Sequence, residues 1–383
     1  MATYRFVATD TVTGALRADT LPLRVTDFGR ALGGVGQPGS LHGSLDLGAS
    51  GFQSAWLEAL EPRRTLLWVL QNGFPVWAGV LWDWPVTSVK SNQLPIIATE
   101  LGSLFARRQV RDDQVYTSVD LYDVIRDLIG YATNTSIKGT QAAVAQLRQT
   151  SNPSGTIVSA TFLATNLGRI LDLINQYATQ YAIEYAFDPG MTDTGALIIT
   201  LRIGTAATMG RAASSTNLRL TYPGNLADYS WPRTGVSGTN ALMAVASGSG
   251  GVAWASNPAT HGRDAADLAA GFPLLEDSVA YSGAVISAQS QIDGFADYRQ
   301  LLVAKTPTIP TATIAGGQSP IVQQILLGDH ATLIASSPLH PEVPGPPPSP
   351  GLIQDVRIIG WTVRPPVDGQ AETTVLTLGG VAS

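Results

Sequence analysis

Hydrophobic residues recur at every second position through much of the first hundred residues, and this period constrains the fold more than any other feature. Side chains two positions apart lie on the same face of an extended chain. Five residues after position 75 follow this spacing: Val76, Ala78, Val80, Trp82 and Trp84. The apolar run Thr65–Leu70 precedes them, and Asn72-Gly73 lies between the two segments. Because Asn and Gly both tolerate positive φ, this arrangement predicts a tight antiparallel hairpin.

The same segment is rich in tryptophan. Five of the eight tryptophans lie there: Trp56, Trp68, Trp77, Trp82 and Trp84. Their positions in dense apolar strands favour a buried aromatic core over an exposed platform for stacking glycans. Trp254 lies in a Gly/Ser-rich stretch and is the better candidate for an exposed tryptophan. We therefore expect residues 1–108 to form a compact antiparallel barrel or sandwich.

The hydrophobic period changes from two to that of a helix after about residue 117. Leu121, Val124, Ile125, Leu128 and Ile129 recur at helical spacing. Thr117-Ser118 before Asp120 predicts the start of this helix, and Gly130 predicts its end.

A second helix is predicted from about Thr165, with its apolar face formed by Leu167, Ile170, Leu171, Ile174 and Ala178. Residues 181–187 and 196–203 then resemble two strands, and the pattern predicts that Asp188-Pro-Gly forms the turn between them. Residues 109–205 are therefore predicted to form a small α/β domain.

The remainder is mostly strand-like and rich in small residues. A helix is predicted over Asp293–Lys305, with Phe295, Leu301 and Leu302 toward a core and Thr306-Pro307 as its stop. The proline-rich segment Pro344–Gly351 is predicted to be an exposed loop, since proline cannot donate to a sheet. Val356–Val363 and Thr373–Leu378 resemble a final pair of strands.

Two distant segments repeat one pattern of strand, proline corner, polar turn and strand. The first begins at Trp82-Asp-Trp-Pro-Val86 and the second at Trp361-Thr-Val-Arg-Pro-Pro-Val367. This echo predicts two related β-domains, one at each end of the chain.

Composition favours an assembled protein. Charged residues make up only 14% of the chain and hydrophobic residues 44%, so much of the surface must be uncharged and prone to association. The net charge of −6 is the wrong sign for gripping nucleic acid. There is no cysteine, which excludes disulfides and thiolate sites. The sequence contains neither a signal peptide nor a membrane-spanning run, which predicts synthesis and folding in the cytosol.

The motifs that could carry chemistry are weak, and we predict no catalytic, cofactor-binding or metal-ligating residue. Gly34-Val-Gly-Gln-Pro-Gly39 matches G-x-G-x-x-G, but a strand-like segment rather than a helix follows it. Asp329-His330 lacks a recognisable nucleophile. The other candidates are scattered histidines and solvated acidic pairs: His42, His261, His340, Asp112-Asp113 and Asp264/Asp267.

The order of segments resembles the hub or minor tail proteins of long-tailed bacteriophages, including phages that infect actinobacteria, and the baseplate hub of contractile tails. The similarity is carried by Trp77-Ala-Gly-Val-Leu-Trp82, the helix Asp120–Ile129, Pro223–Ser230, Gly328-Asp329 and Val375–Gly380. It spans nearly the whole chain, and each motif is short.

The resemblance implies a mainly β fold with α+β insertions. Two tube-type antiparallel β-barrel domains would cover residues 1–108 and residues 206–246 with 320–383. An α/β domain would cover 109–205, and 247–319 would be an insertion domain with one helix.

The resemblance also implies a homotrimer at the tail tip of the virion, with two barrels per chain continuing one another around a ring. Its partners would be the distal tail protein and tail tube above, the tape measure protein, and tip or fibre proteins. DNA would pass through a lumen of small, polar and acidic side chains without specific binding. Loops 33–39, 247–251 and 344–351 would lie at ring faces or the periphery, ordered mainly by neighbouring proteins.

Two other classes of function stay open at this stage. An adhesin that binds host-cell glycans would use exposed aromatic side chains, and a hydrolase would need a converging nucleophile and base.

Overall fold

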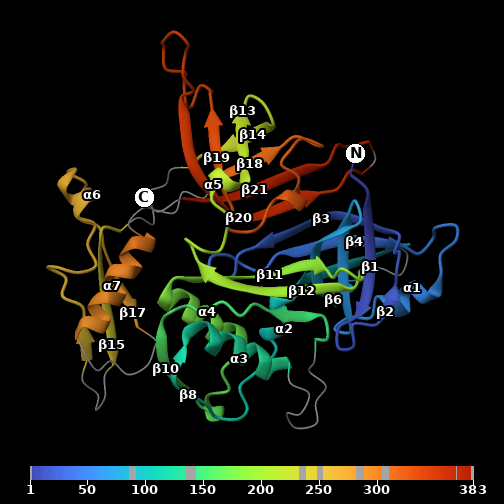
Figure 1. The fold of residues 1–383 in the computed structure, drawn as a ribbon, viewed down its shortest axis with the longest axis horizontal. Helices are drawn as coiled ribbons and strands as arrows, with labels where there is room; N and C mark the ends of the chain where they lie inside the picture. The colour runs from blue at the N-terminus through green and yellow to red at the C-terminus, as the bar shows by residue number, and fades with distance from the viewer. Residues whose placement is uncertain are drawn as a thin grey trace. The chain divides into compact units, whose positions relative to one another are not determined.

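The computed structural model describes residues 2–85, 92–133, 144–232, 239–247, 253–281, 289–303, 310–367 and 369–380 (Figure 1). The chain forms two compact units. Unit 1 contains Met1–Tyr229 and Thr311–Leu378, and unit 2 contains Ser230–Pro310 with Gly379–Ser383. The fold is mainly antiparallel β with a few helices, as the alternating pattern predicted.

The first part of unit 1 is a β-ladder, here called the N-terminal ladder, in which strands pair in the order β2-β1-β5-β6-β7-β4-β3. Its strands are β1 (Tyr4–Asp10), β2 (Leu16–Ala18), β3 (Leu23–Ala31), β4 (Ser40–Asp46), β5 (Thr65–Gln71), β6 (Phe74–Asp83) and β7 (Gln93–Glu100). Two short helices accompany them: α1 (Ser54–Ala59) and α2 (Gly102–Phe105).

The predicted hairpin is confirmed between β5 and β6. Asn72 and Gly73 both have positive φ, at 51° and 87°, as a tight turn between twisted strands requires. The run Thr65–Leu70 is buried on both faces. One face, including Trp68, packs against helices of the next region, and Leu67 and Val69 lie on the other face. This double burial explains why the run does not alternate with polar residues.

The middle of unit 1 packs two helices against two small sheets. Its elements are β8 (Gln114–Asp120), α3 (Leu121–Thr133), β9 (Leu147–Gln149), β10 (Ile157–Phe162), the 3₁₀ turn η2 (Ala164–Asn166), α4 (Ile170–Tyr181), β11 (Ile183–Met191) and β12 (Leu197–Thr205). β8 pairs with β10, and β11-β12-β9 form the second sheet. Buried side chains of α3, α4, β5, β6, β11 and β12 belong to one hydrophobic cluster.

Both predicted helices exist, with corrected boundaries. Thr117 and Ser118 lie in β8, and Asp120 caps α3 by accepting the Tyr122 N–H at 2.9 Å. The predicted stop at Gly130 is wrong, because α3 continues to Thr133. The helix predicted from Thr165 begins at Ile170, and Leu167 is 55% exposed in a left-handed turn before it.

The predicted turn at Asp188-Pro-Gly is also wrong. Asp188 and Gly190 lie inside β11, where they pair with Thr200 and Ile198 of β12. The hairpin turns at residues 192–196 instead, where the Thr192 N–H donates to the Ala196 carbonyl at 2.9 Å. The composition of the segment indicated a turn, but the sheet extends through it.

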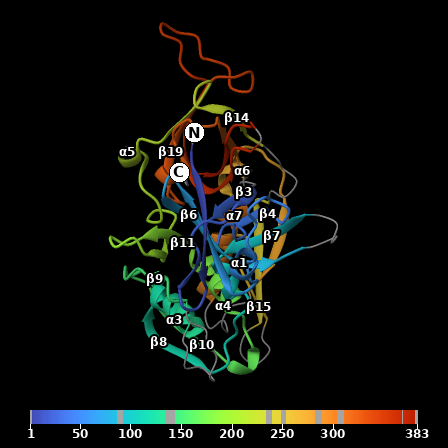
Figure 2. The ribbon, with the colours of Figure 1, turned by 90° about the vertical axis from the view of Figure 1, so that its right-hand side faces the viewer.

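The last part of unit 1 is a second ladder, the C-terminal ladder, in the order β13-β19-β20-β21-β18-β14. Its strands are β13 (Arg219–Tyr222), β14 (Leu226–Ser230), β18 (Thr311–Ile314), β19 (His330–Ala335), β20 (Leu352–Arg364) and β21 (Thr373–Gly380), with short helices α5 (Ala213–Thr216) and η4 (Val322–Gln324). Figure 2 views these strands nearly end on, where they curve around a common interior. β20 and β21 are the predicted final pair, and residues 344–349 of the loop predicted over Pro344–Gly351 are exposed, whereas Pro350 and Gly351 are half-buried.

The two ladders repeat one strand order. Along the chain β3, β4, β5, β6 and β7 correspond to β14, β18, β19, β20 and β21, and both sets are arranged in space with the fourth strand between the third and the fifth. The echo around Trp82 and Trp361 falls on the equivalent hairpins β6–β7 and β20–β21, although Val86 lies outside the described residues. One difference is that β1 pairs antiparallel with β5, whereas β13 pairs parallel with β19.

The ladders join edge to edge within the chain. The first half of β20 pairs with β19, and residues Gly360–Val363 of β20 then pair with Ala31–Phe28 of β3. All thirteen strands therefore belong to one continuous sheet.

The described residues of unit 2 form a three-stranded sheet with two helices. Its elements are β15 (Ala241–Ser247), β16 (Ala253–Ala255), α6 (Ala265–Ala269), β17 (Glu276–Ala280) and α7 (Gln289–Val303). The sheet order is β16-β15-β17, and Ile292 and Ala296 of α7 pack on Ala244 of β15. α7 is the helix predicted over Asp293–Lys305, and Phe295 packs against this cluster. Lys305, the Thr306-Pro307 stop, the Leu301 and Leu302 side chains and residues 248–251 lie outside the described residues.

Candidate functional site

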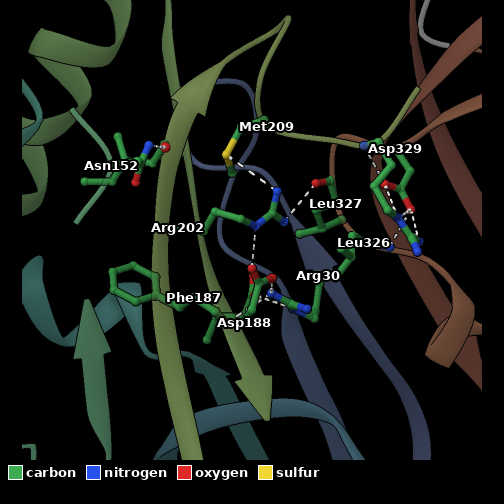
Figure 3. A network of polar contacts seen from close by, with 12 residues as sticks. Arg30, Asn152, Phe187, Asp188, Arg202, Met209, Leu326, Leu327 and Asp329 are labelled. Atoms are coloured by element: carbon green, nitrogen blue, oxygen red, sulfur yellow. Dashed lines mark hydrogen bonds and ion pairs between the residues drawn. The ribbon is translucent and has the colours of Figure 1, made fainter. Parts of the chain in front are cut away.

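The strand β11 contacts both β3 and β20, and a chain of buried and half-buried charges runs across it (Figure 3). Arg30 of β3 donates to Glu100 at 3.1 Å and to Asp188 at 2.8 Å. Arg202 of β12 donates to the other oxygen of Asp188 at 2.7 Å and to the Leu327 carbonyl, just before β19, at 2.9 Å. This chain of contacts connects the N-terminal ladder, the β11–β12 hairpin and the C-terminal ladder.

A second, buried ion pair also connects β11 to the C-terminal ladder. Both terminal nitrogens of Arg357 in β20 donate to the two oxygens of Glu184 in β11, at 2.9 and 2.6 Å. The two side chains are only 7% and 8% exposed. Such a bidentate pair fixes orientation as well as distance. We call the residues Arg30, Glu100, Glu184, Asp188, Arg202 and Arg357 the charged junction.

In the charged junction, burial and pairing have opposite effects on the pKa values of the carboxyl groups. Burial would raise the pKa of Asp188, but the guanidiniums of Arg30 and Arg202 lower it below its usual value. Burial raises the pKa of Glu100, against the lowering effect of Arg30 and of the Gly39 and Ala31 N–H groups. Asp188 thus accepts hydrogen bonds from two guanidiniums, and Glu100 accepts them from one guanidinium and two backbone N–H groups.

The glycine-rich segment 33–39 lies against the charged junction. Gly33 exchanges two backbone hydrogen bonds with Tyr185, and the Gly39 N–H donates to Glu100 at 2.7 Å. A Cβ on Gly39 would lie 1.9 Å from the Gly29 carbonyl oxygen. Both ends of this loop are therefore held by the chain itself, and its ordering by neighbouring proteins stays a prediction.

The sequence candidates for catalysis do not converge. Asp329 binds Arg211 at 2.5 Å and accepts the Arg211 and Leu326 N–H groups, and it makes no contact with the His330 ring. Asp112 accepts a hydrogen bond from Tyr131, Asp113 accepts the Ala164 N–H, and Asp264 caps α6. The remaining histidines contact Asp27 (His42), Asp297 (His261) and Tyr229 (His340).

The tryptophans are not exposed. All eight lie in described ranges; Trp68, Trp77 and Trp361 are buried and the other five are half-buried. The expectation of an exposed Trp254 is wrong, because this side chain packs against the Ile292 cluster of unit 2.

Two wider searches were limited to the described residues. No group of three or more His, Asp or Glu side chains there is placed to hold a metal ion. No helix there is both long and apolar enough to cross a membrane.

Sequence reasoning missed the charged junction. Its signal was the presence of charged residues inside apolar strand-like runs, such as Glu184 within Tyr181–Phe187. Charged residues are rarely buried unless they are paired, so each could have been predicted to have a partner. The identity of that partner depends on long-range pairing.

Comparison with known proteins identifies the fold. No protein-family model and no curated protein matches the chain. Among solved structures, the 43 kDa tail protein of prophage MuSo2 from Shewanella oneidensis is 12% identical, with a TM-score of 0.59 over 98% of this chain and 97% of that one. The chain has the fold of prophage tail proteins.

Two further tail proteins support this assignment of the fold. The tail protein from Neisseria meningitidis MC58 is 13% identical, with a TM-score of 0.55 over 98% of this chain and 96% of that one. Prophage tail protein gp18 from Listeria monocytogenes EGD-e is 14% identical, with a TM-score of 0.51 over 97% and 94%. The matches span nearly the full length of all three tail proteins, so the fold they share with this chain includes both ladders.

Proposed function

We propose that this chain is a structural hub at the tail tip of a long-tailed bacteriophage and that three copies form a ring. Each copy contributes two tube-type β-domains, so the ring presents six to the tail tube and distal tail protein above. The tape measure protein and the tip or fibre proteins would be its other partners. The ring would form part of the conduit through which DNA leaves the tail, and its role would not be enzymatic.

The repeated strand order of the two ladders is the observation that carries this proposal. A ring of three chains can match a six-fold partner only when each chain presents two equivalent domains. The equivalent strands of the two ladders and their edge-to-edge joining through β20 and β3 meet this requirement within one chain.

Charge and fold support the same role. Three chains at −6 each sum to −18, which suits a conduit along which a polyanion slides without sticking. A charged fraction of only 14% suits surfaces that are covered in an assembly. The shared fold with three prophage tail proteins is consistent with such a location.

Mass and symmetry test the proposal. We expect native mass spectrometry of the purified chain at high concentration to give a trimer. We also expect electron microscopy of particles with this chain labelled to place it in a ring at the tail tip. A chain that stays monomeric in both settings, or a label elsewhere in the particle, would contradict the hub.

The glycan-binding alternative has less support. Stacking platforms need exposed aromatic faces, whereas the eight tryptophans are buried or half-buried. Binding of the purified protein to a glycan array would distinguish a structural hub from a glycan-binding adhesin. We expect no specific binding.

A further inference from the structure

The joint between the ladders has a defined structure inside each chain. Residues Gly360–Val363 of β20 pair with Phe28–Ala31 of β3. The indole of Trp361 meets the ring of Phe28 edge-on, with the centroids 5.8 Å apart. A Cβ on Gly29 would lie 2.7 Å from the Trp361 carbonyl oxygen, so the two backbones approach closely.

The strands of this joint have equivalents in the other ladder. β6 corresponds to β20, and β14 corresponds to β3. The aromatic packing follows the same correspondence. Tyr4 meets Phe28 of β3 edge-on at 5.9 Å, and Tyr222 meets Tyr229 of β14 in the same way at 5.4 Å.

Among the described residues, each chain leaves one strand of each kind without a neighbour along part of its edge. On the side of β6 that faces β5, the last backbone hydrogen bond between described residues runs from the Arg63 N–H to the Leu81 carbonyl. On its other side β6 pairs with β7 as far as Asp83. In the described part of the C-terminal ladder, β14 is an end strand whose single neighbour is β18.

We propose that the end of β6 in one copy pairs with β14 of the next copy and thus repeats the joint that β20 and β3 make inside the chain. This inference rests on the proposed ring, and it names the strands that close the ring. The partner is a second copy, because the two unpaired strands are equivalents of a pair that already fits. An exposed strand edge carries unpaired N–H and C=O groups that favour such pairing. The contact is head to tail, so it closes into a ring when the rotation between copies allows.

The absence of cysteine from the chain permits a direct test. Three single variants each replace one exposed aspartate: Asp83→Cys at the end of β6, Asp228→Cys in β14, and Asp193→Cys in the β11–β12 turn as the matched control. Each pair of variants is mixed, allowed to assemble, and treated with a short bismaleimide linker. The mass of the untreated mixture is measured in parallel.

We expect cross-linked dimers when Asp83→Cys and Asp228→Cys are mixed, at least about tenfold above either variant alone or either mixed with Asp193→Cys, because paired strands lie only about 5 Å apart. A trimer without this cross-link, or one in which each variant cross-links only to its own kind, would overturn the pairing and leave the ring intact. A mixture that never assembles would overturn the ring itself.

Amide exchange gives a second measurement on the unmodified chain. We expect residues 81–83 and 226–230 to exchange about tenfold more slowly in the trimer than in the diluted monomer, because strand pairing protects backbone N–H groups. The exposed strand β8 should not change. Trimers with no added protection in both segments would also overturn the pairing.

Discussion

The two ladders share a strand order but differ most in the connection after β3 and after its equivalent β14. In the N-terminal ladder this connection is residues 32–39, fixed by backbone contacts to Tyr185 and by Glu100. In the C-terminal ladder the same connection, residues 231–310, holds most of unit 2. The pairing of strands thus tolerates either a short, tightly held loop or an inserted folding unit, because the connection lies outside the ladder that it joins.

The hydrophobic cores of the N-terminal ladder and of unit 2 differ in size. Side chains of the N-terminal ladder join a large cluster with α3, α4 and β11. The buried cluster of unit 2 consists of Ala244, Ile292 and Ala296, with half-buried neighbours. We therefore expect the two ladders to unfold together, and unit 2 to unfold separately at a lower temperature or urea concentration.

Removal of a guanidinium from the charged junction should have the largest effect. Arg30→Ala removes the guanidinium that pairs with the buried Glu100 and one of the two that pair with Asp188, and breaking a buried pair costs about 3–5 kcal/mol. Urea unfolding followed by tryptophan fluorescence measures this, because six of the eight tryptophans belong to unit 1.

The matched control is Arg5→Ala, whose partner Asp19 is 3.7 Å away and exposed. Its effect should stay below about 1 kcal/mol. Equal losses for the two variants would show that burial of the junction contributes nothing.

Ile292→Ala should destabilise unit 2 alone. Ile292 is fully buried in a small cluster, and truncation of such a side chain costs about 2–5 kcal/mol. Limited proteolysis should then cut within residues 239–303, while hydrogen exchange of β5 and β20 stays as in the parent chain. Faster exchange in the ladders as well would mean that the two units fold as one.

Gly39→Ala should loosen the short connection of the N-terminal ladder. Its new methyl group would meet the Gly29 backbone, which cannot move without disturbing β3, so we expect a loss of about 1–3 kcal/mol. The control is Gly294→Ala in α7, where the methyl group meets nothing within 4 Å. Replacing a glycine inside a helix should there gain about 1 kcal/mol for unit 2. Thermal unfolding of both variants tests whether Gly39→Ala lowers the unfolding temperature of the ladders and Gly294→Ala raises that of unit 2.

Asp188→Asn should change the pH dependence of stability, because the amide keeps only one acceptor oxygen and loses the charge that lies between Arg30 and Arg202. The folded pKa of Asp188 lies below its unfolded value, so its stabilising effect is complete above the unfolded pKa of about 4 and is lost as the pH falls through the folded pKa. The difference in stability between parent and variant should therefore be full at pH 7 and narrow below about pH 4. A constant difference between pH 7 and pH 3 would contradict this role of the carboxylate.

Local patterns in the sequence determined the elements with strong periodicity. An apolar run predicted β5, alternation predicted β6, the Asn72-Gly73 pair predicted their turn, and helical spacing predicted α3, α4 and α7. These signals work because side-chain direction repeats every two residues in a strand and every 3.6 in a helix. The repeat around Trp82 and Trp361 also predicted equivalent hairpins before any strand order was known.

Only the tertiary structure decided which strands and charges meet. Asp188-Pro-Gly has the composition of a turn, but pairing with β12 keeps it extended and places Asp188 between Arg30 and Arg202. Arg357 and Glu184 lie 173 positions apart in the chain, and no local signal connects residues at such a distance. Burial and partners depend on how distant segments pack, and this packing brought the two ladders together through β20 and β3.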